Sequence, residues 1–387
     1  MKILIANDTY YPHVNGASYF TQRLAAGLAA RGHTVAVIAP SQTNLYTVQE
    51  RFGVTEYGMR SIKVPEFIHT NFQICLPFHK KKIREICTKF KPDIIHVQMH
   101  LSVGRNLITV AKEMGIPIML TNHFMPDNLT PYLPGPMFIK KLITEILWRD
   151  FAHMANKVDY IVSPTKIAAD LVQPRLKKVV HAVSNGIDLS HFSPGAARAE
   201  VYDLYHLPHE PFFLFVGRLD AEKNLDEVIK AYAKIAPDLT QALVLAGIGT
   251  QLESLQALAK KLGVTERVFF PGFVTNEDLP DIYKMAMTFM MAGTAELQSI
   301  VTLEAMSTGL PVIAVNAAAL PELAHNNVNG FLYEHGDVAH MAACMKTLAQ
   351  DSELRAKMGE ESLKIVSLHK IENTFVEYER IYTEVIG

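Results

Sequence analysis

Short runs of wholly apolar residues, each followed by a helix-like segment, recur along this chain of 387 residues and strongly constrain its fold. The runs at 2–6 and 34–39 are typical of strands buried on both faces, and a helix is expected between them over about 17–31. A strand, a helix and a strand in this order predict parallel pairing with a right-handed crossover. We therefore expect an α/β fold built on parallel sheets.

The same alternation occurs in two series. In the first series, further strands are predicted at 93–97, 117–120 and 159–162, with helices over about 103–114, 136–156 and 165–171. In the second, strands are predicted at 212–216, 243–246, 268–270, 288–291 and 312–315, with helices over 225–235, about 251–262, 276–285, and near 337–349, 352–366 and 370–385. Between the two series, turn-forming residues cluster over about 185–211.

This organisation predicts two Rossmann-like domains, because 387 residues exceed what one ordinary core holds. We place an N-terminal domain at 1–188 and a C-terminal domain at 189–369. The last helix, about 370–387, is expected to pack back on the first domain. Open α/β sheets bind ligands beyond the carboxyl ends of their strands, so a cleft between the domains is expected to hold the site.

The composition and the order of apolar residues argue against a membrane-spanning protein and against a signal peptide. The chain is 49% hydrophobic and 20% charged, as in soluble globular proteins, and no apolar run approaches the ~20 residues of a membrane span. Polar residues occur too early for a signal peptide, and three cysteines without metal-binding spacing suit a reducing cytoplasm. We expect a cytoplasmic protein, with peripheral attachment to the inner face of the cell membrane as a further option.

The net charge of −2 hides an asymmetry between the halves. Residues 1–190 carry 22 Lys and Arg against 13 Asp and Glu, a balance of +9, and residues 191–387 carry 15 against 26, a balance of −11. The first half therefore favours anionic partners, such as an anionic membrane surface or a phosphorylated substrate. Nucleic acid is not expected, because the chain has no basic tract interleaved with aromatic residues.

Two carboxylates, Glu296 and Glu304, flank a predicted helix start. The N–H groups of Ile300 and Val301 would be unpaired there, which suits a phosphate. Carboxylates on either side can accept hydrogen bonds from sugar hydroxyls, so the stretch has the features of a nucleotide-sugar site. From the residues alone, a solvated Glu296 and a Glu304 paired with a lysine are the alternative interpretation.

A second loop, 217–224, follows the first strand of the second series. Gly217 permits a turn at the strand end, and the loop carries two cations, Arg218 and Lys223. Together these cations could hold a diphosphate, with arginine as a fork and lysine as a point charge. Pairing of one of them with Asp220 or Glu222 is equally expected from the residues alone.

Taken together, 217–224, Glu296 with Glu304-Ala305-Met306, and Gly309-Leu310-Pro311-Val312 closely resemble the retaining glycosyltransferases of family 4, which have the two-Rossmann-domain GT-B fold. Asn185-Gly186-Ile187-Asp188 is similar to the family's linker motif, and 12–17 to its glycine-rich loop. The resemblance covers essentially the whole chain in the correct order. Among family members, the loops at 12–17 and 121–126 look most like those of enzymes that glycosylate membrane lipids such as diacylglycerol or phosphatidylinositol.

The resemblance implies a hexosyltransferase whose domain at 1–188 binds the acceptor and whose domain at 189–369 binds the nucleotide sugar. It also assigns roles to individual residues. Arg218 and Lys223 would bind the donor diphosphate and stabilise its departing charge. Glu296 would hold the transferred sugar and Glu304 the ribose. Further donor-binding positions are implied at Gly16, Gly217, Gly272, Phe273, Val274, Ser299, Ile300 and Val301.

His123 and Ser299 need separate comment. His123 matches a family histidine that faces the transferred sugar, so we count it with Arg218, Lys223 and Glu296 as catalytic; without the resemblance it would be an ordinary loop histidine. Ser299 stands where the family often has glycine, which makes the donor less predictable. Leu297 and Ser184 also depart from the common pattern, and none of these departures removes a charged role.

No metal and no bound cofactor is expected. Gly247-Ile248-Gly249 begins like a dinucleotide-binding fingerprint, but Leu252 occupies its third glycine position, so a tight turn is the better interpretation. The chain contains no Asp-x-Asp pair, which glycosyltransferases use to bind a divalent ion. The two cations and the helix start would take over that task.

The acceptor depends on two segments of the first half. Basic residues accompany an apolar stripe at 78–91 and again at 137–149, and such helices can lie on anionic lipid or pack on the sheet. We predict transfer of a hexose from a UDP- or GDP-sugar to a membrane lipid, in glycolipid biosynthesis. The alternative is a soluble acceptor: a sugar phosphate, a thiol precursor or a polysaccharide. A nucleotide-sugar epimerase and an inactive sugar-nucleotide binder are rivals from other classes.

Overall fold

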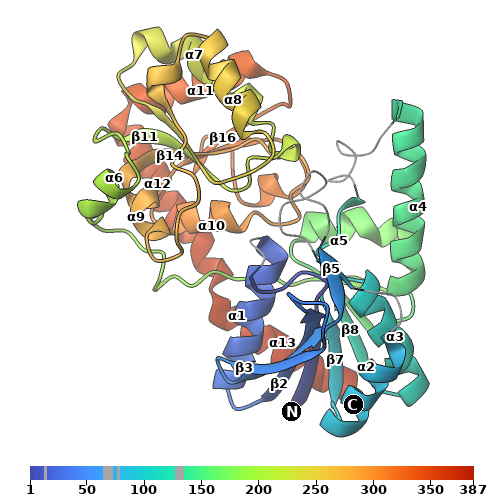
Figure 1. The fold of residues 1–387 in the computed structure, drawn as a ribbon. Helices are drawn as coiled ribbons and strands as arrows, with labels where there is room; N and C mark the ends of the chain where they lie inside the picture. Colours follow the sequence, from blue (N-terminus) through green and yellow to red (C-terminus); the bar gives the residue numbers. More distant parts are fainter. Residues whose placement is uncertain (13–14, 64–72, 76–78, 127–134) are drawn as a thin grey trace. The chain divides into compact units, whose positions relative to one another are not determined.

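The computed structural model describes residues 1–12, 15–63, 73–75, 79–126 and 135–387 (Figure 1). The chain forms two compact units. Unit 1 comprises 1–185 together with 372–387, and unit 2 comprises 186–371. Each unit is built on a mainly parallel sheet covered by helices, which confirms the predicted α/β fold with two Rossmann-like domains.

Unit 1 contains an eight-stranded sheet in the order β10-β9-β8-β7-β1-β2-β4-β3. All neighbours are parallel except β3 and β4. The predicted strands are present at β1 (Lys2–Ala6), β2 (Thr34–Pro40), β7 (Ile94–Val97), β8 (Ile118–Thr121) and β9 (Tyr160–Ser163). The sequence did not reveal β3 (Thr47–Arg51), β4 (Val54–Met59), β10 (Val180–Ala182), or the separate pair β5 (Ser61–Lys63) and β6 (Gln73–Cys75).

The helices of unit 1 are α1 (Gly16–Ala30), α2 (Lys80–Phe90), α3 (Ser102–Met114), α4 (Met137–Ala155), α5 (Lys166–Val172) and α13 (Ile371–Ile386). The chain's last helix, α13, buries Tyr378, Ile381 and Tyr382 against Ile3 and Phe20. Its burial explains why these aromatic and apolar side chains recur at helical spacing. At the carboxyl side of α1, Arg31 forms a two-pronged ion pair with Glu379 of α13.

Unit 2 contains six parallel strands in the order β13-β12-β11-β14-β15-β16. They are β11 (Phe212–Val216), β12 (Leu243–Ala246), β13 (Val268–Phe269), β14 (Ala286–Met291), β15 (Val312–Val315) and β16 (Gly330–Tyr333). The helices are α6 (Glu200–Leu204), α7 (Leu225–Ile235), α8 (Leu252–Lys261), α9 (Leu279–Met285), α10 (Ile300–Ser307), α11 (Val338–Gln350) and α12 (Ser352–Val366).

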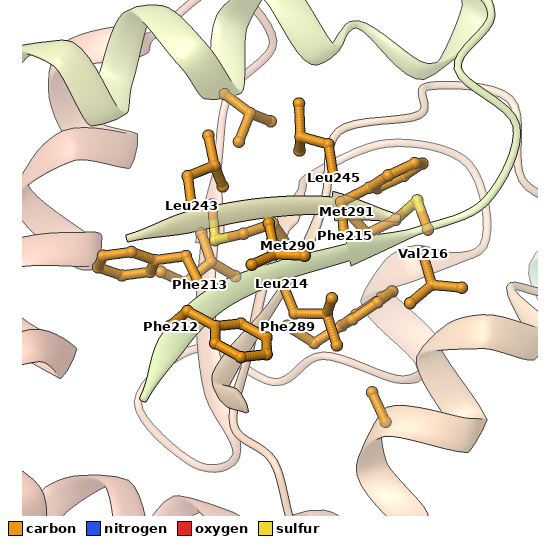
Figure 2. Packing of buried hydrophobic residues seen from close by; sticks show 14 of the residues in the cluster. Phe212, Phe213, Leu214, Phe215, Val216, Leu243, Leu245, Phe289, Met290 and Met291 are labelled. Carbon is orange, nitrogen blue, oxygen red and sulfur yellow. The ribbon is translucent and has the colours of Figure 1, made fainter. Parts of the chain in front are cut away.

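The core of unit 2 lies on both faces of its central strands. Figure 2 shows side chains of β11, β12 and β14 projecting to both sides of the sheet. Every residue of β11 is buried, which explains its continuous apolar run. Across the ranges described above, no helix combines the length and apolarity that a membrane span requires.

Candidate active site

In unit 2, the chain changes direction across the sheet at β11. From β11 it adds β12 and β13 on one side, then returns to add β14, β15 and β16 on the other. The loops that leave β11 and β14 therefore diverge at the carboxyl edge of neighbouring strands, where open α/β sheets bind ligands. The first loop carries Arg218 and Lys223, and the second carries Glu296.

Glycines let the loop after β12 press against the loop after β11. A Cβ on Gly247, which has φ 144°, would lie 1.8 Å from the carbonyl oxygen of Gly217. A Cβ on Gly249 would lie 2.4 Å from the backbone of Leu219. The Leu219 N–H donates to the Ile248 carbonyl at 2.9 Å. Close backbone packing thus accounts for both glycines of the Gly-Ile-Gly sequence.

Arg218 is held by two buried carboxylates. Its Nη1 donates to Asp220 at 2.5 Å and its Nη2 to Glu222 at 2.6 Å. The second oxygen of Asp220 accepts from the Thr250 N–H at 2.8 Å and from its hydroxyl at 2.9 Å. The ion pairing that the sequence left open is therefore present, and it fixes the plane of the guanidinium at the strand end.

Lys223 forms an ion pair with Glu296, which is 73 residues further along the chain. Asn224 ties the two loops together, because its Nδ2 donates to the Ala292 carbonyl at 3.0 Å. Gly293 makes room for the pair: a Cβ there would lie 3.0 Å from Oε1 of Glu296 and 3.4 Å from Cδ of Lys223. The structure thus brings together the cation and the carboxylate that the two motifs predicted separately.

Helix α10 begins at Ile300, as the sequence predicted. Ser299 precedes it with an extended backbone, and its carbonyl accepts the first helical hydrogen bond, from the Leu303 N–H at 3.2 Å. The N–H groups of Ile300 and Val301 therefore come before the first intrahelical hydrogen bond. The Thr302 hydroxyl donates to the Ser299 hydroxyl at 2.8 Å, so a serine is accommodated at this helix start.

Glu304 faces inward from α10 and is buried. It accepts a hydrogen bond from the hydroxyl of Tyr283 on α9 at 3.0 Å. Burial raises the pKa of Tyr283 well above its ordinary value, and the charge of Glu304 raises that pKa further. The sequence suggested a lysine as the alternative partner of Glu304; the structure provides a neutral tyrosine hydroxyl.

The remaining donor-binding position of unit 2 predicted from the family is the segment 272–274. It follows β13, which lies at the edge of the sheet, two strands from β11. Gly272 has φ 77°, Val274 is buried, and the Phe273 side chain is about half exposed. The segment therefore presents an aromatic ring beyond the same carboxyl edge.

Gly16 and His123 belong to unit 1. Gly16 is the first residue of α1, where the Asn15 side chain caps the helix by accepting from the Ser18 N–H at 2.9 Å. His13 and Val14, which precede it in the glycine-rich loop, lie outside the described residues.

His123 follows β8, and its Nε2 lies 2.9 Å from Oε1 of Gln98. Burial lowers the pKa of His123 to about 4, so its imidazole is neutral at ordinary pH.

Three residues at these sites were missed by sequence reasoning: Tyr283, Gly293 and Gln98. Tyr283 and Gly293 carry no signal of their own, because their roles appear only when α9 and the loop after β14 approach the site. Gln98 follows β7 directly, and a polar residue at the carboxyl end of a buried strand is a recognisable sign of a site in this class of sheet.

Comparison with known proteins identifies the family to which the chain is similar. Residues 205–364 match the family model described as glycosyl transferases group 1, and residues 14–191 match that of glycosyltransferase family 4. The alpha-monoglucosyldiacylglycerol synthase of Streptococcus pneumoniae is 27% identical over 378 residues, which cover 95% of this chain and 82% of the relative. The N-acetyl-alpha-D-glucosaminyl L-malate synthase of Bacillus anthracis is 25% identical, over 100% of this chain and 98% of the relative.

Solved structures show the same fold. The Anabaena protein HepE, crystallised with UDP-glucose, superposes with a TM-score of 0.77 at 17% identity, covering 99% of this chain and 100% of that one. The two-unit fold and the two family matches define a glycosyltransferase, an enzyme that takes its sugar from a nucleotide sugar. The chain belongs to glycosyltransferase family 4.

Proposed function

We propose that this protein is a retaining hexosyltransferase that moves a hexose from a UDP- or GDP-sugar to a hydroxyl of a membrane lipid such as diacylglycerol. The observation that carries the donor part of this proposal is the ion pair between Lys223 and Glu296 at the point where the unit 2 sheet reverses its strand order. Arg218 lies in the same loop as Lys223 and is held by its own two carboxylates. Lys223 pairs with Glu296, which lies four residues before α10, and the N-terminus of that helix carries the positive end of its dipole.

In the proposed mechanism, the donor diphosphate lies between the loop after β11 and the start of α10. The Lys223 ammonium has three N–H donors and uses one on Glu296, so it can bridge the carboxylate and a phosphate oxygen. Asp220 and Glu222 hold the Arg218 guanidinium in place for the same anion. As the bond to the sugar breaks, negative charge grows on the departing nucleoside diphosphate, and these fixed donors stabilise it.

The two glutamates of the α10 region have different proposed partners. Glu296, held by Lys223, would accept hydrogen bonds from hydroxyls of the transferred hexose. Glu304, held by Tyr283, would accept from the ribose. Phe273, with Gly272 and Val274, would flank the base, and Ser299 would add a hydroxyl beside the N–H groups of Ile300 and Val301. Gly16 would let the first loop of unit 1 approach the diphosphate.

The proposed chemistry uses no divalent ion and no bound cofactor. The diphosphate would be neutralised by Arg218, Lys223 and the start of α10, and the chain has no Asp-x-Asp pair to carry an ion to it. Transfer with retention would follow from the resemblance to the family. The part played by unit 2 is to fix hydrogen-bond donors around the leaving group and to hold the sugar by Glu296. His123 of unit 1 is proposed separately as a residue that faces the substrate.

The membrane lipid acceptor is supported by the relative that carries the name of a glucosyldiacylglycerol synthase and by the basic first half of the chain. The structure distinguishes the two helices that the sequence offered for membrane contact. In α2, Ile83, Ile86 and Cys87 are buried in the core of unit 1, so only a basic outer face remains. This stripe packs inward, as amphipathic helices commonly do.

Helix α4 differs, because much of its apolar face is exposed. Phe138, Leu142 and Ile146 are spaced four residues apart and are 71%, 61% and 55% exposed. Met137 and Ile139 extend this exposed face, and Lys140 and Lys141 lie within the same stretch. An apolar stripe flanked by lysines suits the surface of an anionic bilayer. We therefore propose α4 as the part of unit 1 that contacts the membrane.

The proposed function is tested by transfer assays with the purified full-length protein. UDP- and GDP-hexoses would be supplied with vesicles containing diacylglycerol, and products separated by chromatography. A glycolipid whose new linkage has the donor's anomeric configuration, determined by NMR, is the expected result. Inversion would contradict the retaining mechanism, and the absence of transfer from every donor to any lipid would contradict the lipid acceptor.

A soluble acceptor is the second candidate, and one observation favours it. The Bacillus anthracis relative, which matches this chain over nearly its whole length, is named for a product made on malate, a small dicarboxylate. Parallel assays with malate, sugar phosphates and inositol phosphate separate the two candidates. Transfer to one of these in solution, without vesicles and at rates above those with lipid, would favour the soluble acceptor.

A further inference from the structure

The described contacts of His123 are asymmetric. Its Nε2 lies 2.9 Å from Oε1 of Gln98, and an amide oxygen only accepts hydrogen bonds. Nε2 must therefore carry the proton. Because the imidazole is neutral, Nδ1 then has a lone pair and acts as an acceptor. Among the described residues, no hydrogen bond to Nδ1 is found, and the ring packs against Phe20 with centroids 5.2 Å apart.

Gln98 is itself fixed from below by a buried polar cluster. Its amide nitrogen lies 3.0 Å from Nε2 and 3.3 Å from Nδ1 of the fully buried His96, so this nitrogen sits over the imidazole ring. His96 faces the Thr121 hydroxyl at 2.7 Å with Nε2 and the Tyr382 hydroxyl at 2.7 Å with Nδ1. Hydroxyl groups can donate or accept, so either neutral form of His96 is satisfied. An amide N–H group is favoured over the face of an aromatic ring, so the amide nitrogen of Gln98 lies toward His96 and its oxygen faces His123.

The cluster joins parts of the chain that are distant in sequence. Tyr378 and Tyr382 come from α13, His96 and Gln98 from the end of β7, and Thr121 from β8. All of these side chains are fully or almost fully buried, and they end at the half-buried His123. Burial lowers the pKa of His96 to about 3, so the cluster is uncharged at ordinary pH. A neutral, buried network can hold one side-chain orientation without a fixed charge.

We propose that Gln98 is a positioning residue: it holds His123 as the Nε2–H tautomer, so that Nδ1 accepts a hydrogen bond from a hydroxyl of the substrate. This proposal rests on the substrate-facing role proposed above for His123. It makes His123 an acceptor toward the substrate and excludes it as a donor at Nδ1. The substrate group it recognises is therefore a hydroxyl that can donate, on the transferred sugar or on the acceptor.

The tautomer is measured directly, without any activity assay. Two-bond ¹H–¹⁵N correlation spectra of the protein with ¹⁵N-labelled histidine distinguish a protonated from an unprotonated ring nitrogen. The signals of His123 are identified by their loss in His123→Asn. The expected pattern for the ligand-free wild type is Nε2–H. An Nδ1–H pattern would overturn the proposal, whatever the enzyme's activity.

Variants of Gln98 test the consequence for turnover. Gln98→Leu removes the acceptor, so an Nδ1–H form should appear beside the Nε2–H form, and kcat should fall about tenfold, the effect of one hydrogen bond. Gln98→Glu keeps an accepting oxygen at the same place, so Nε2 should stay protonated, but its buried negative charge should raise the pKa of His123. Most of kcat should therefore return only at a pH above that raised pKa. Unchanged signature and kcat in Gln98→Leu would overturn the proposal.

Tyr378→Phe is the matched control. It removes a hydroxyl that contacts Thr121 at 3.0 Å in the same cluster but touches neither Gln98 nor His123. The His123 signature and kcat should stay at the wild-type values, while the protein loses some stability. If instead His123→Asn keeps full activity although the wild type shows the Nε2–H pattern, the role of His123 in the proposed function fails and the positioning by Gln98 stands.

Discussion

Lys223 and Glu296 form an ion pair between the ends of two adjacent strands, and their side chains are only 18% and 16% exposed. A charge pair that is largely shielded from water interacts more strongly than a surface pair. Removing one partner leaves the other charge poorly solvated and misplaced. The pair therefore sets the position of both groups before any donor binds.

We expect Lys223→Ala and Glu296→Ala each to lower kcat by roughly 10²- to 10³-fold, the usual effect of removing one preorganised group that stabilises developing charge. Steady-state assays with the donor found active above measure this. Lys230→Ala is the control, because Lys230 pairs with Asp226 on the exposed face of α7. Its kcat should stay within about twofold of wild type. Near-normal rates in both site variants would show that the pair is structural only.

The strands that could be predicted from sequence are those buried on both faces. The run 212–216 is apolar at every position because β11 is covered on both sides. By contrast, β3 exposes four of its five residues, so its side chains carry no burial pattern. Strand β16 was missed for a different reason. Its first residue is Gly330, where a Cβ would lie 1.8 Å from the Val312 carbonyl oxygen, so close packing requires a residue that breaks the strand pattern.

The sequence could predict those residues of the candidate site that lie together in one short motif. Arg218 and Lys223 share one short loop, so the sequence could predict that both lie at the end of the same strand. The contacts of Gln98 with His123 and of Tyr283 with Glu304 join separate elements, and local pattern does not reveal them. Periodicity also could not separate α2 from α4, because both have an apolar stripe and only packing decides which stripe is covered.

Tyr283→Phe should weaken donor binding more than turnover. The hydroxyl of Tyr283 donates to Glu304, and losing a hydrogen bond to a buried carboxylate costs about 1–3 kcal/mol. If Glu304 holds the ribose equally in the ground state and the transition state, the donor KM should rise roughly tenfold with kcat nearly unchanged. Tyr232→Phe is a matched control, since the buried Tyr232 on α7 donates to the Gln241 carbonyl at 2.8 Å elsewhere in unit 2. It should cost stability without changing the donor KM.

Activity should not depend on a divalent ion. The proposed neutralisation of the diphosphate by Arg218, Lys223 and the start of α10 leaves no step for such an ion. Assays of protein dialysed against EDTA, with and without added Mg²⁺ or Mn²⁺, should give rates within about twofold of each other. A loss of activity that one of these ions restores would contradict the proposal.

The ion pair between Arg31 and Glu379 should make the stability of unit 1 depend on pH in acid. Hydrogen bonds from Arg31, with a smaller effect of His33, lower the pKa of Glu379 to about 2. A depressed carboxyl pKa contributes stability above the ordinary value of about 4.5, and this contribution is lost as pH falls toward 2. Glu379→Gln should therefore be less stable than wild type at pH 6–7, and the difference should shrink below about pH 4.5.

Urea unfolding followed by the fluorescence of Trp148 measures this difference. Trp148 is the only tryptophan of the chain and is buried in unit 1, so its signal reports on that unit. Glu377→Gln is the control, because Glu377 pairs only locally with Arg380 on the outside of α13. A difference between Glu379→Gln and wild type that persists unchanged down to pH 3 would show that the carboxylate's charge is not what stabilises the contact.

The exposed face of α4 should determine binding to anionic membranes. Phe138 and Leu142 are 71% and 61% exposed, and burying a large apolar side chain contributes about 1.5–3 kcal/mol. Replacing both by serine should lower the affinity for phosphatidylglycerol vesicles at least about tenfold, measured by sedimentation with vesicles. Binding of the wild type should weaken at high salt and on phosphatidylcholine vesicles, because the lysines of unit 1 also contribute.

Leu204→Ser separates membrane contact from a general loss of surface hydrophobicity. Leu204 lies on α6 of unit 2 and is 61% exposed, the same fraction as Leu142. This variant should bind vesicles like the wild type. The α4 variant should also keep wild-type hydrolysis of the donor in solution, because the donor-binding residues of unit 2 are unchanged, while its transfer to vesicle lipid falls with its affinity. Equal vesicle binding by wild type and both variants would exclude α4 as the membrane contact and leave the basic face of α2 as the surface to test.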